Sequence, residues 1–298
     1  MPIHGVLLLD KSAGMTSNDA LIKAKRLFNA QKAGHTGTLD PFATGLLPLC
    51  FGEATKFSQD LLEADKSYET MVHLGVTTTT GDTEGDVVQN RQADPTLAQI
   101  ESAIAELRGE IDQIPPMYSA LKRDGKPLYE YARAGMTLER EARRVTIHEL
   151  EMLDYCWPYM QLHVRCSKGT YVRVLGETIG EKLGCGAHLQ SLRRTQVGKL
   201  KLEHACTLDD LSAMPDEERL GSLAMIDALL SSFPSVVLSA ELARRFLQGQ
   251  RLSMEKEGLE APAEAGRVRV YGDDGQRLLG TAQIREFGVL APERLVAL

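Results

Sequence analysis

The sequence predicts an α+β protein, and two kinds of pattern support this class. Residues 66–75 and 160–166 have the composition or the apolar–polar alternation of half-buried strands. Residues 96–109 instead place apolar side chains at helical spacing. Strands and helices in irregular succession are typical of the α+β class, although this pattern alone does not specify the order of strands in the sheet.

The first third of the chain is expected to begin with a short buried strand at residues 5–11. Ser17 has the side chain of a helix N-cap, and the apolar residues after it recur at helical spacing. A glycine-rich loop occupies residues 34–45. Residues 53–63 are expected to be helical and to lead into the strand at 66–75.

The middle of the chain is expected to hold the helix at 96–109, strands at 144–154 and 160–166, and a helix at 170–183 that ends at Gly184. Alternate residues of the second strand should share one buried face. These residues are Met160, Leu162, Val164 and Cys166.

Residues 115–144 differ in composition from their surroundings. They open with Pro115-Pro116, are rich in Lys, Arg and Tyr, and have little apolar content. We therefore expect an insertion that reaches out of the domain, with a short helix near 127–134. Its apolar area should be too small for it to fold against the domain alone.

The C-terminal part of the chain is expected to form a second, smaller domain. Acidic, turn-rich sequence at residues 207–232 precedes Pro234, where we place the boundary between domains 1–233 and 234–298. The elements expected after it are a helix at 240–248 and strands at 268–271 and 277–284. Short strands with one small helix predict a compact β-rich module.

The composition is that of an ordinary globular protein, with 43% apolar and 25% charged residues among 298. No run of 18 apolar residues predicts a membrane-spanning helix, so we expect no membrane partner. The N-terminus has no basic leader, and the five cysteines form no Cys-x-x-Cys pair. Both features predict a protein of the reducing cytoplasm without disulfides.

No metal site is predicted from the sequence. Asp82, Glu84 and Asp86 alternate as calcium ligands do, but the twelfth position counted from Asp82 is Ala93 rather than Glu. The cysteines and the seven histidines lack the spacing of zinc ligands.

Charge is distributed unevenly along the chain. The net charge of −7 argues by itself against a nucleic-acid partner. Residues 165–201, however, carry eight Lys or Arg against two Glu, a local charge of +6, and residues 115–145 carry seven against four acids, a local charge of +3. Basic regions on an acidic protein are typical of a polyanion bound at one face and repelled elsewhere.

The loop at residues 34–45 is the strongest candidate for a functional site. Three glycines and one proline exclude a regular helix or strand, and the proline after Asp40 holds that residue's backbone extended, so its carboxylate can be aimed. The loop is either a surface turn with a capping Asp or a rigid active-site loop that presents Asp40. It lacks the Gly-Lys-Ser/Thr ending of a phosphate-binding loop.

Three further stretches contain reactive or basic side chains, at residues 66–68, 167–175 and 186–195. Taken singly, each has a structural interpretation. Tyr68 and Leu192 have the character of core residues, and an arginine on a helix, such as Arg173, is usually solvated.

Taken together, these motifs resemble the bacterial tRNA pseudouridine-55 synthase family. The resemblance covers residues 3 to about 230 and is carried by five motifs in the order found in that family. They are His-Thr-Gly-Thr-Leu-Asp-Pro (35–41), Lys-Ser-Tyr (66–68), Tyr-Ser-Ala-Leu-Lys (118–122), Lys-Gly-Thr-Tyr-Val-Arg (168–173) and Leu-Arg-Arg-Thr (192–195). The C-terminal part resembles the small PUA-type RNA-binding module of such enzymes.

The resemblance implies an isomerase that converts uridine 55 in the T stem-loop of tRNA to pseudouridine without a cofactor. It also implies a catalytic domain built on a mixed, mainly antiparallel sheet, and a monomer that needs no protein partner. The same family includes the catalytic subunit of guide-RNA-dependent complexes. The short chain without a long basic tail favours the stand-alone bacterial type.

By position in the motifs, the resemblance implies that Asp40 is the essential catalytic carboxylate. Three roles stay open for it: attack on the sugar, attack on the base, or abstraction of a ribose proton. Arg173 would make a two-pronged contact with Asp40 through its planar guanidinium, keeping the carboxylate ionised and oriented in a site that excludes water.

The remaining site residues follow from the same motifs. Because the target base is stacked inside a folded loop, the enzyme must flip it out and fill its place. His35 would stack into the RNA there, while Tyr68 would stack against the flipped uracil and help remove the C5 proton. Tyr171 and Leu192 would complete the pocket. The residues expected to contact RNA phosphates are Lys122, Arg123, Lys126, Arg193 and Arg194.

Two other functions are consistent with parts of the sequence. A non-catalytic RNA-binding protein would use the basic segments and the C-terminal module, but it would not need Asp40, Tyr68 and Arg173 together. A hydrolase could use Asp40, yet no second carboxylate at a convincing position, metal cluster or Gly-x-Ser-x-Gly motif supports it.

Overall fold

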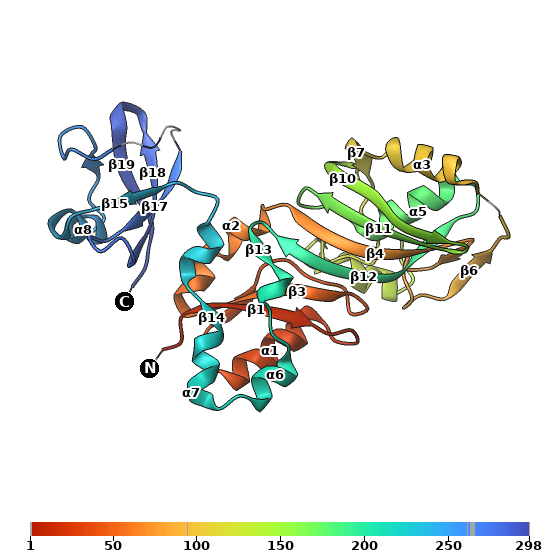
Figure 1. Ribbon diagram of the computed structural model, residues 1–298, viewed down its shortest axis with the longest axis horizontal. Helices are drawn as coiled ribbons and strands as arrows, with labels where there is room; N and C mark the ends of the chain where they lie inside the picture. The colour runs from red at the N-terminus through yellow and green to blue at the C-terminus, as the bar shows by residue number, and fades with distance from the viewer. Residues whose placement is uncertain (1, 94, 261, 263–265, 298) are drawn as a thin grey trace.

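The computed structural model describes residues 2–93, 95–260, 262 and 266–297. Among these residues, ten strands form one large sheet, to which the smaller C-terminal sheet is attached at one end of the molecule (Figure 1). In chain order the strands of the large sheet are β1 (Gly5–Lys11), β2 (Ala33–His35), β3 (Thr44–Phe51), β4 (Lys66–Leu74), β7 (Gly109–Gln113), β10 (Arg143–Cys156), β11 (Tyr159–Cys166), β12 (Ala187–Val197), β13 (Leu200–Lys201) and β14 (Leu223–Ala224).

The large sheet is mixed and mainly antiparallel, as the resemblance implies. Its order is β14-β1-β3-β12-β4-β11-β10-β7, with β2 beside β3 and β13 beside β12. The pairing of β3 with β12 is parallel, and the other pairings found among the described strands of this sheet are antiparallel. β12 lies at the centre of the sheet, although the sequence did not predict it as a strand.

The register of the central strands brings two predicted site residues and the last residue of the glycine-rich loop into one row. Tyr68 on β4 lies opposite Val164 on β11 and opposite Arg194 on β12. Arg194 in turn lies opposite Gly45 at the start of β3. The segments before β3 and at the start of β4 therefore meet through β12.

Helices flank the sheet, and α5 packs on β12. The α-helices are α1 (Ser17–Leu27), α2 (Ser58–Leu62), α3 (Leu97–Ala105), α4 (Leu128–Arg133), α5 (Val172–Lys182), α6 (Leu208–Ala213), α7 (Asp216–Arg219) and α8 (Ala240–Leu247). Short 3₁₀ turns are η1 (Gly52–Phe57), η2 (Leu202–His204), η3 (Leu220–Ser222), η4 (Ile226–Leu230) and η5 (Glu286–Gly288). A separate hairpin pairs β5 (Val76–Thr78) with β6 (Val87–Asn90).

The predicted cap of α1 is wrong by one residue. Thr16 is the N-cap, and its side chain and that of Asp19 form a capping box. Ser17 is instead buried, and its hydroxyl both donates to the Leu39 carbonyl (3.0 Å) and accepts from the Leu39 amide (2.8 Å). A residue expected to cap the start of a helix thus fixes the glycine-rich loop.

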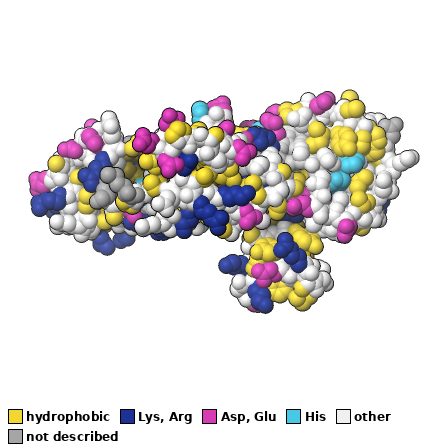
Figure 2. All heavy atoms as spheres, turned by 90° about the horizontal axis from the view of Figure 1, so that it is seen from below, with side chains coloured by type: hydrophobic (Ala, Val, Ile, Leu, Met, Phe, Trp, Pro, Cys, Tyr) yellow, Lys and Arg dark blue, Asp and Glu magenta, His cyan; other side chains and the backbone are white. Residues whose placement is uncertain are grey.

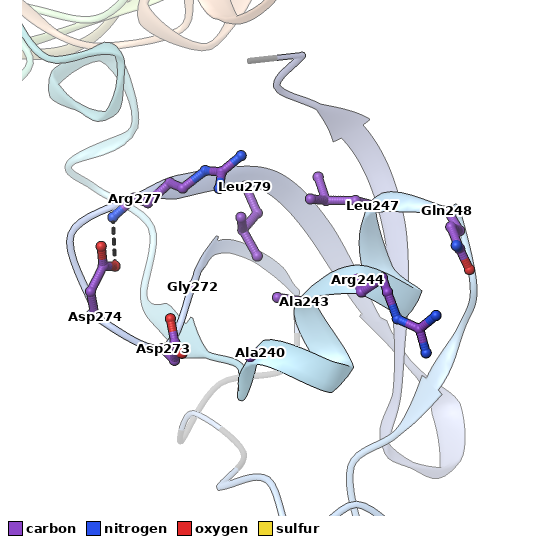
Figure 3. A pocket seen from close by; sticks show the side chains of 10 residues that line it. All are labelled: Ala240, Ala243, Arg244, Leu247, Gln248, Gly272, Asp273, Asp274, Arg277 and Leu279. Atoms are coloured by element: carbon purple, nitrogen blue, oxygen red, sulfur yellow. Dashed lines mark hydrogen bonds between the residues drawn. The ribbon is translucent and has the colours of Figure 1, made fainter.

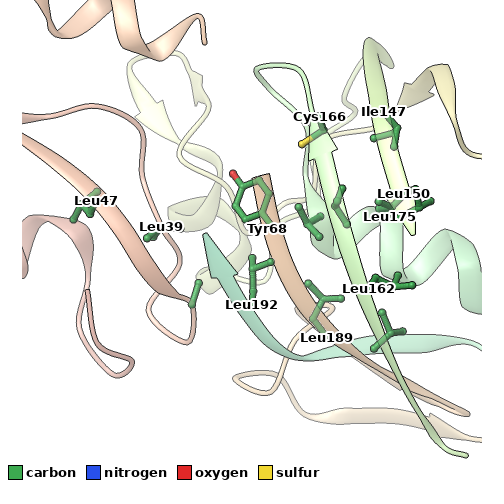
Figure 4. Close-up of a cluster of buried hydrophobic side chains, with 14 of the residues drawn as sticks. Leu39, Leu47, Tyr68, Ile147, Leu150, Leu162, Cys166, Leu175, Leu189 and Leu192 are labelled. Carbon is green, nitrogen blue, oxygen red and sulfur yellow. The ribbon is translucent and has the colours of Figure 1, made fainter. Parts of the chain in front are cut away.

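The buried face of β11 is confirmed. Its four alternate apolar residues, Met160, Leu162, Val164 and Cys166, are at most 1% exposed. They pack in the main core with residues of β4, β12 and α5 (Figure 4). Because period-2 alternation places these side chains on one face, this strand was predictable from sequence alone.

The insertion is folded against the domain, contrary to the expectation that its apolar area is too small. It contains a short hairpin of β8 (Lys122–Arg123) and β9 (Lys126–Pro127), followed by α4. Leu128 and Ser119 are buried, and the Leu128 amide donates to the Leu121 carbonyl at 2.7 Å. One buried leucine, backbone hydrogen bonds within the insertion and a hydrogen bond from the Arg173 side chain to the Tyr118 carbonyl (2.6 Å) replace a large apolar core.

The C-terminal module is a five-stranded sheet with one helix, α8. Its strands are β15 (Ser235–Val237), β16 (Leu252–Ser253), β17 (Arg267–Tyr271), β18 (Leu278–Arg285) and β19 (Val289–Leu295), in the order β15-β17-β18-β19-β16. The predicted helix and two strands are confirmed, while β15, β16 and β19 were not predicted. Among the described residues, no helix is both long and apolar enough to cross a membrane.

A mixed apolar and charged interface holds the module on the catalytic domain. Buried apolar residues from both sides share one cluster: Ala54, Phe57 and Leu61 with Tyr271, Leu278 and Val296. Beside it, the Asp60 carboxylate on α2 is 6% exposed and forms ion pairs with Arg267 and Arg294 of the module. The Arg294 guanidinium also donates to the Lys56 carbonyl at 2.8 Å.

We expect Asp60→Asn to lower the free energy of unfolding by about 3 kcal/mol, because it leaves two partly buried guanidinium groups without their shared anion. Urea denaturation would measure the change. Glu106→Gln, which breaks the exposed pair with Lys182, is the matched control and should cost about 0.5 kcal/mol. Equal effects of the two substitutions would show that the Asp60 pairs do not stabilise the docked module.

Candidate active site

Several cavities in the described part of the chain have charged side chains in their linings, and two of them show how their chemistry differs. One, of about 480 Å³, lies in the C-terminal module between α8 and the turn that follows β17 (Figure 3). Its Asp274 carboxylate caps that turn by accepting from the amides of Gln276 and Arg277. This acid therefore has a local structural role.

The second cavity, of about 440 Å³, is lined by the loop that carries Asp40. Four segments far apart in the sequence form its walls: the start of α1, the glycine-rich loop, the turn at residues 80–84, and the insertion, with Arg173 of α5 at its base. The charged side chains in its lining are Asp40, Asp82, Glu84, Arg133 and Arg173. This convergence of distant segments makes it the candidate active site.

The backbone around Asp40 is held from both sides by buried donors. Ser17 fixes Leu39, the residue before it, through both backbone groups. Lys11, which is fully buried, donates through Nζ to the carbonyl of Pro41, the residue after it, at 3.3 Å. Since both neighbours are fixed, the position of the Asp40 carboxylate is set by the fold.

Arg173 forms the predicted ion pair with Asp40, with 2.9 Å between Nε and Oδ2. The geometry differs from the expected two-pronged contact, because Nη1 donates to the Thr80 carbonyl (2.7 Å) and Nη2 to the Tyr118 carbonyl (2.6 Å). The guanidinium is 3% exposed and also lies 3.6 Å from Asp82 Oδ2. It therefore joins four segments and contacts Asp40 through Oδ2, and no hydrogen bond to Asp40 Oδ1 is found among the described residues.

The electrostatics of the pair also differ from the expectation that Arg173 simply keeps Asp40 ionised. Burial raises the pKa of Asp40, with Asp82 acting in the same direction, while Arg173 and Lys11 oppose the rise. Burial likewise lowers the pKa of Lys11 to about 8, against the charges of Asp40 and Glu84. The Asp40 side chain is 34% exposed, so the result is a partly buried carboxylate whose anion is compensated only in part.

Arg194 is not placed to contact RNA phosphates, so this prediction is wrong. Its side chain is 1% exposed. Nε donates to the Leu46 carbonyl at 2.8 Å and Nη2 to the Gly37 carbonyl at 3.2 Å, and the guanidinium hydrogen-bonds the Tyr68 hydroxyl. Arg194 thus ties both ends of the glycine-rich loop to β4.

Gly45 makes this contact possible. Its φ is +100°, and a Cβ atom at this position would lie 2.3 Å from the carbonyl oxygen of Arg194. A side chain here would push β3 away from β12, so the glycine is needed for close backbone approach as well as for the turn.

Tyr68 and Leu192 lie side by side in the main core, between Leu39 on one side and Leu162 on the other, and the tyrosine hydroxyl points away from Leu192 (Figure 4). Both are largely buried, at 9% and 7% exposure. Burial raises the pKa of Tyr68 to about 12, and the Asp40 charge adds to this effect while Arg194 opposes it. The phenol is therefore neutral at pH 7.

The other predicted site residues differ in their exposure and in their partners. His35 lines the cavity, its Nδ1 has no hydrogen-bond partner among the described residues, and burial lowers its pKa. Tyr171 is half-buried next to Arg173, and burial raises its pKa. Arg193 is half-exposed but pairs with Asp10 at 2.6 Å.

Three basic residues of the insertion, Lys122, Arg123 and Lys126, are exposed. Dark-blue Lys and Arg side chains also gather along the middle of the face seen in Figure 2. In the part of the chain that the structure describes, no three His, Cys, Asp or Glu side chains gather as metal ligands would.

Several positioning residues were missed at the sequence level. Gln113 is buried, accepts from the Tyr171 amide (3.0 Å) and donates to its carbonyl (3.3 Å), which fixes the start of α5. Lys11 and Ser17 hold the Asp40 loop in the same way. The one available signal was a charged residue, Lys11, at the end of an apolar strand.

The chain is similar to known proteins in both sequence and fold. Residues 25–172 match the TruB family pseudouridylate synthase (N terminal domain), residues 173–237 the tRNA pseudouridylate synthase B C-terminal domain, and residues 234–296 the pseudouridine synthase II TruB C-terminal domain.

Curated relatives match over nearly the whole chain. The chain is 64% identical over 295 residues to tRNA pseudouridine synthase B of Burkholderia mallei (strain NCTC 10247), covering 99% of this chain and 97% of the relative. It is 61% identical over 300 residues to that of Cupriavidus pinatubonensis (strain JMP 134 / LMG 1197), covering 99% and 95%. Its fold is similar to a chain of a Cbf5-Nop10-Gar1 complex, with a TM-score of 0.76, 26% identity, and 98% and 84% coverage.

We expect Arg194→Met to destabilise the protein by about 3 kcal/mol or more, since it leaves buried carbonyls and the Tyr68 hydroxyl without a donor. The adjacent residue supplies the control: Arg193→Met removes a half-exposed ion pair and should cost about 1 kcal/mol. Urea denaturation of both variants would check this. If both variants lose the same stability, Arg194 does not have the assigned structural role.

Proposed function

The chain belongs to the TruB family of pseudouridylate synthases and makes pseudouridine at position 55 of tRNA, and we propose that Asp40 is the carboxylate with which it does so. The observation that carries this proposal is the 2.9 Å ion pair between Asp40 and the buried Arg173 at the base of a cavity. A partly buried carboxylate that is held by a buried arginine in this way is typical of an active site.

The substrate would be a uridine turned out of the T stem-loop into the cavity. A stacked base cannot be reached inside a folded RNA loop, so base flipping must precede the reaction. The cavity volume of about 440 Å³ supports binding of a single everted nucleotide. Oδ1 of Asp40, which Arg173 leaves free, would be the oxygen nearest to the reaction.

Tyr68 and Leu192 would form the apolar wall behind the base. Both belong to the core cluster that also contains Leu39, and Leu39 lines the cavity. Because its pKa is about 12, Tyr68 is poorly suited to take a proton at neutral pH, and stacking is the role that its environment favours. Tyr171 would close the cavity on the side of α5.

His35 would fill the space that the flipped base leaves in the RNA. A lowered pKa keeps its imidazole neutral at pH 7, which favours stacking among bases. The exposed Lys122, Arg123 and Lys126 would contact phosphates, and Arg193 could join them only by sharing its contact with Asp10.

We further propose that the catalytic domain ends near Pro234 and that the module after it contributes to tRNA binding. The enzyme would act as a monomer in the cytoplasm, on the T stem-loop alone and without a cofactor. A short connection, residues 231–234, separates the last turn of the catalytic domain from β15.

We expect Asp40→Asn to lower turnover by about 10⁴-fold or more, because the amide keeps the shape but not the charge of the essential group. Binding of the T stem-loop should be nearly unchanged. Mass-spectrometric mapping of pseudouridine in a treated T stem-loop, together with a binding titration, would measure both quantities. Substantial conversion by the variant would rule out the role of Asp40.

We expect Arg173→Lys to lower kcat by about 100-fold or more, since one ammonium cannot reach Asp40, the Thr80 carbonyl and the Tyr118 carbonyl at once. Single-turnover kinetics on the same stem-loop would separate this effect from binding. Near-normal kcat would mean that the position of Asp40 does not depend on the guanidinium.

A further inference from the structure

The cavity has a wall that the predicted site residues do not account for. Tyr129 and Arg133, one turn apart on α4 of the insertion, both line the cavity that holds Asp40 and Arg173. Neither residue belongs to a motif that the sequence interpretation used. Their position makes α4 part of the active-site cavity rather than only part of an outer RNA-binding arm.

The two side chains form a preorganised unit. The guanidinium carbon of Arg133 lies 5.3 Å from the centre of the Tyr129 ring. Stacking on an aromatic face fixes the plane of a guanidinium while its N–H groups stay available at the edge. Such an arrangement suits a planar, two-pronged contact with an anion.

The charge balance of the cavity leaves Arg133 free for such a contact. The lining contains three acids, Asp40, Asp82 and Glu84. The N–H groups of Arg173 already contact Asp40 and two backbone carbonyls. Within the described part of the chain, Arg133 makes no ion pair and no side-chain hydrogen bond.

Helix α4, which carries Tyr129 and Arg133, is linked to Arg173. The Tyr129 amide donates to the Ser119 carbonyl at 3.2 Å, and Leu128 is 4% exposed. The backbone carbonyl of Tyr118, next to Ser119, accepts a hydrogen bond from Arg173 Nη2 at 2.6 Å. The position of Arg133 is therefore tied to that of Arg173, and through it to Asp40.

We propose that Arg133, held on the Tyr129 ring, binds one of the two phosphates that flank the everted uridine. This inference rests on the proposed function. A nucleotide that enters the cavity must bring its two phosphodiesters towards a wall with three acids, and a free cation at that wall would compensate this repulsion. Arg133 would thereby select a flipped nucleotide, with its phosphate, over a free base.

A double-mutant cycle between protein and RNA tests the proposal. T stem-loops carrying a single neutral methylphosphonate on the 5′ or the 3′ side of the target uridine are compared with the unmodified RNA, using wild type and Arg133→Gln. We expect Arg133→Gln alone to lower kcat/KM about tenfold, as loss of one charged contact does. One of the two methylphosphonates should lower it similarly, with no further loss when combined with Arg133→Gln.

Multiplicative losses at both positions, about 100-fold in each combination, would overturn the proposal. Arg251→Gln serves as the control, since Arg251 is an exposed arginine of the module and its effect should multiply with both methylphosphonates. Tyr129→Leu should reproduce part of the Arg133→Gln effect and Tyr129→Phe should not. Thermal melting would verify that each variant is folded.

Conversion of the unmodified stem-loop by wild type distinguishes a failure of the proposed function from a failure of the role proposed for Arg133. If wild type does not convert the unmodified stem-loop, the proposed function itself fails. If it does convert it but no coupling between Arg133 and either phosphate is found, only the role of Arg133 is lost.

Discussion

The guanidinium of Arg173 is the interaction on which the rest of the site depends. Its three nitrogen groups contact Asp40, the turn at residue 80 and the insertion at residue 118, while its own backbone begins α5. A buried arginine is stable only when all its donors have partners. The arrangement of these segments is therefore the condition under which Arg173 can be buried, and the cavity is its consequence.

A second buried arginine performs the same task in the sheet. Arg194 on β12 reaches backbone carbonyls at both ends of the glycine-rich loop and the hydroxyl of Tyr68. Because β12 pairs with β3 and with β4, the loop and the tyrosine are held by one strand. Arg173 holds Asp40 through its carboxylate, and Arg194 holds the backbone of the loop that carries Asp40.

The sequence alone was sufficient to predict those elements whose structure is decided by a local pattern. The alternation in β11, the spacing in α3 and the composition of the module each predicted an element. The pair of Asp40 and Arg173 was predictable only through the resemblance. Arg194 shows the limit: period-2 alternation in Leu192-Arg193-Arg194 indicates that one arginine points inward, but its burial becomes evident only when β12 is known to lie at the sheet centre.

The balance of charges at Asp40 explains why a desolvated carboxylate suits this reaction. Full compensation by Arg173 would lower its pKa and make the anion a weaker nucleophile and a weaker base. Burial and Asp82 act against that compensation, so the anion keeps its reactivity, and the contact at Oδ2 leaves Oδ1 available. This holds for attack on the sugar, attack on the base and proton abstraction alike, because each requires an electron pair that is oriented without being neutralised.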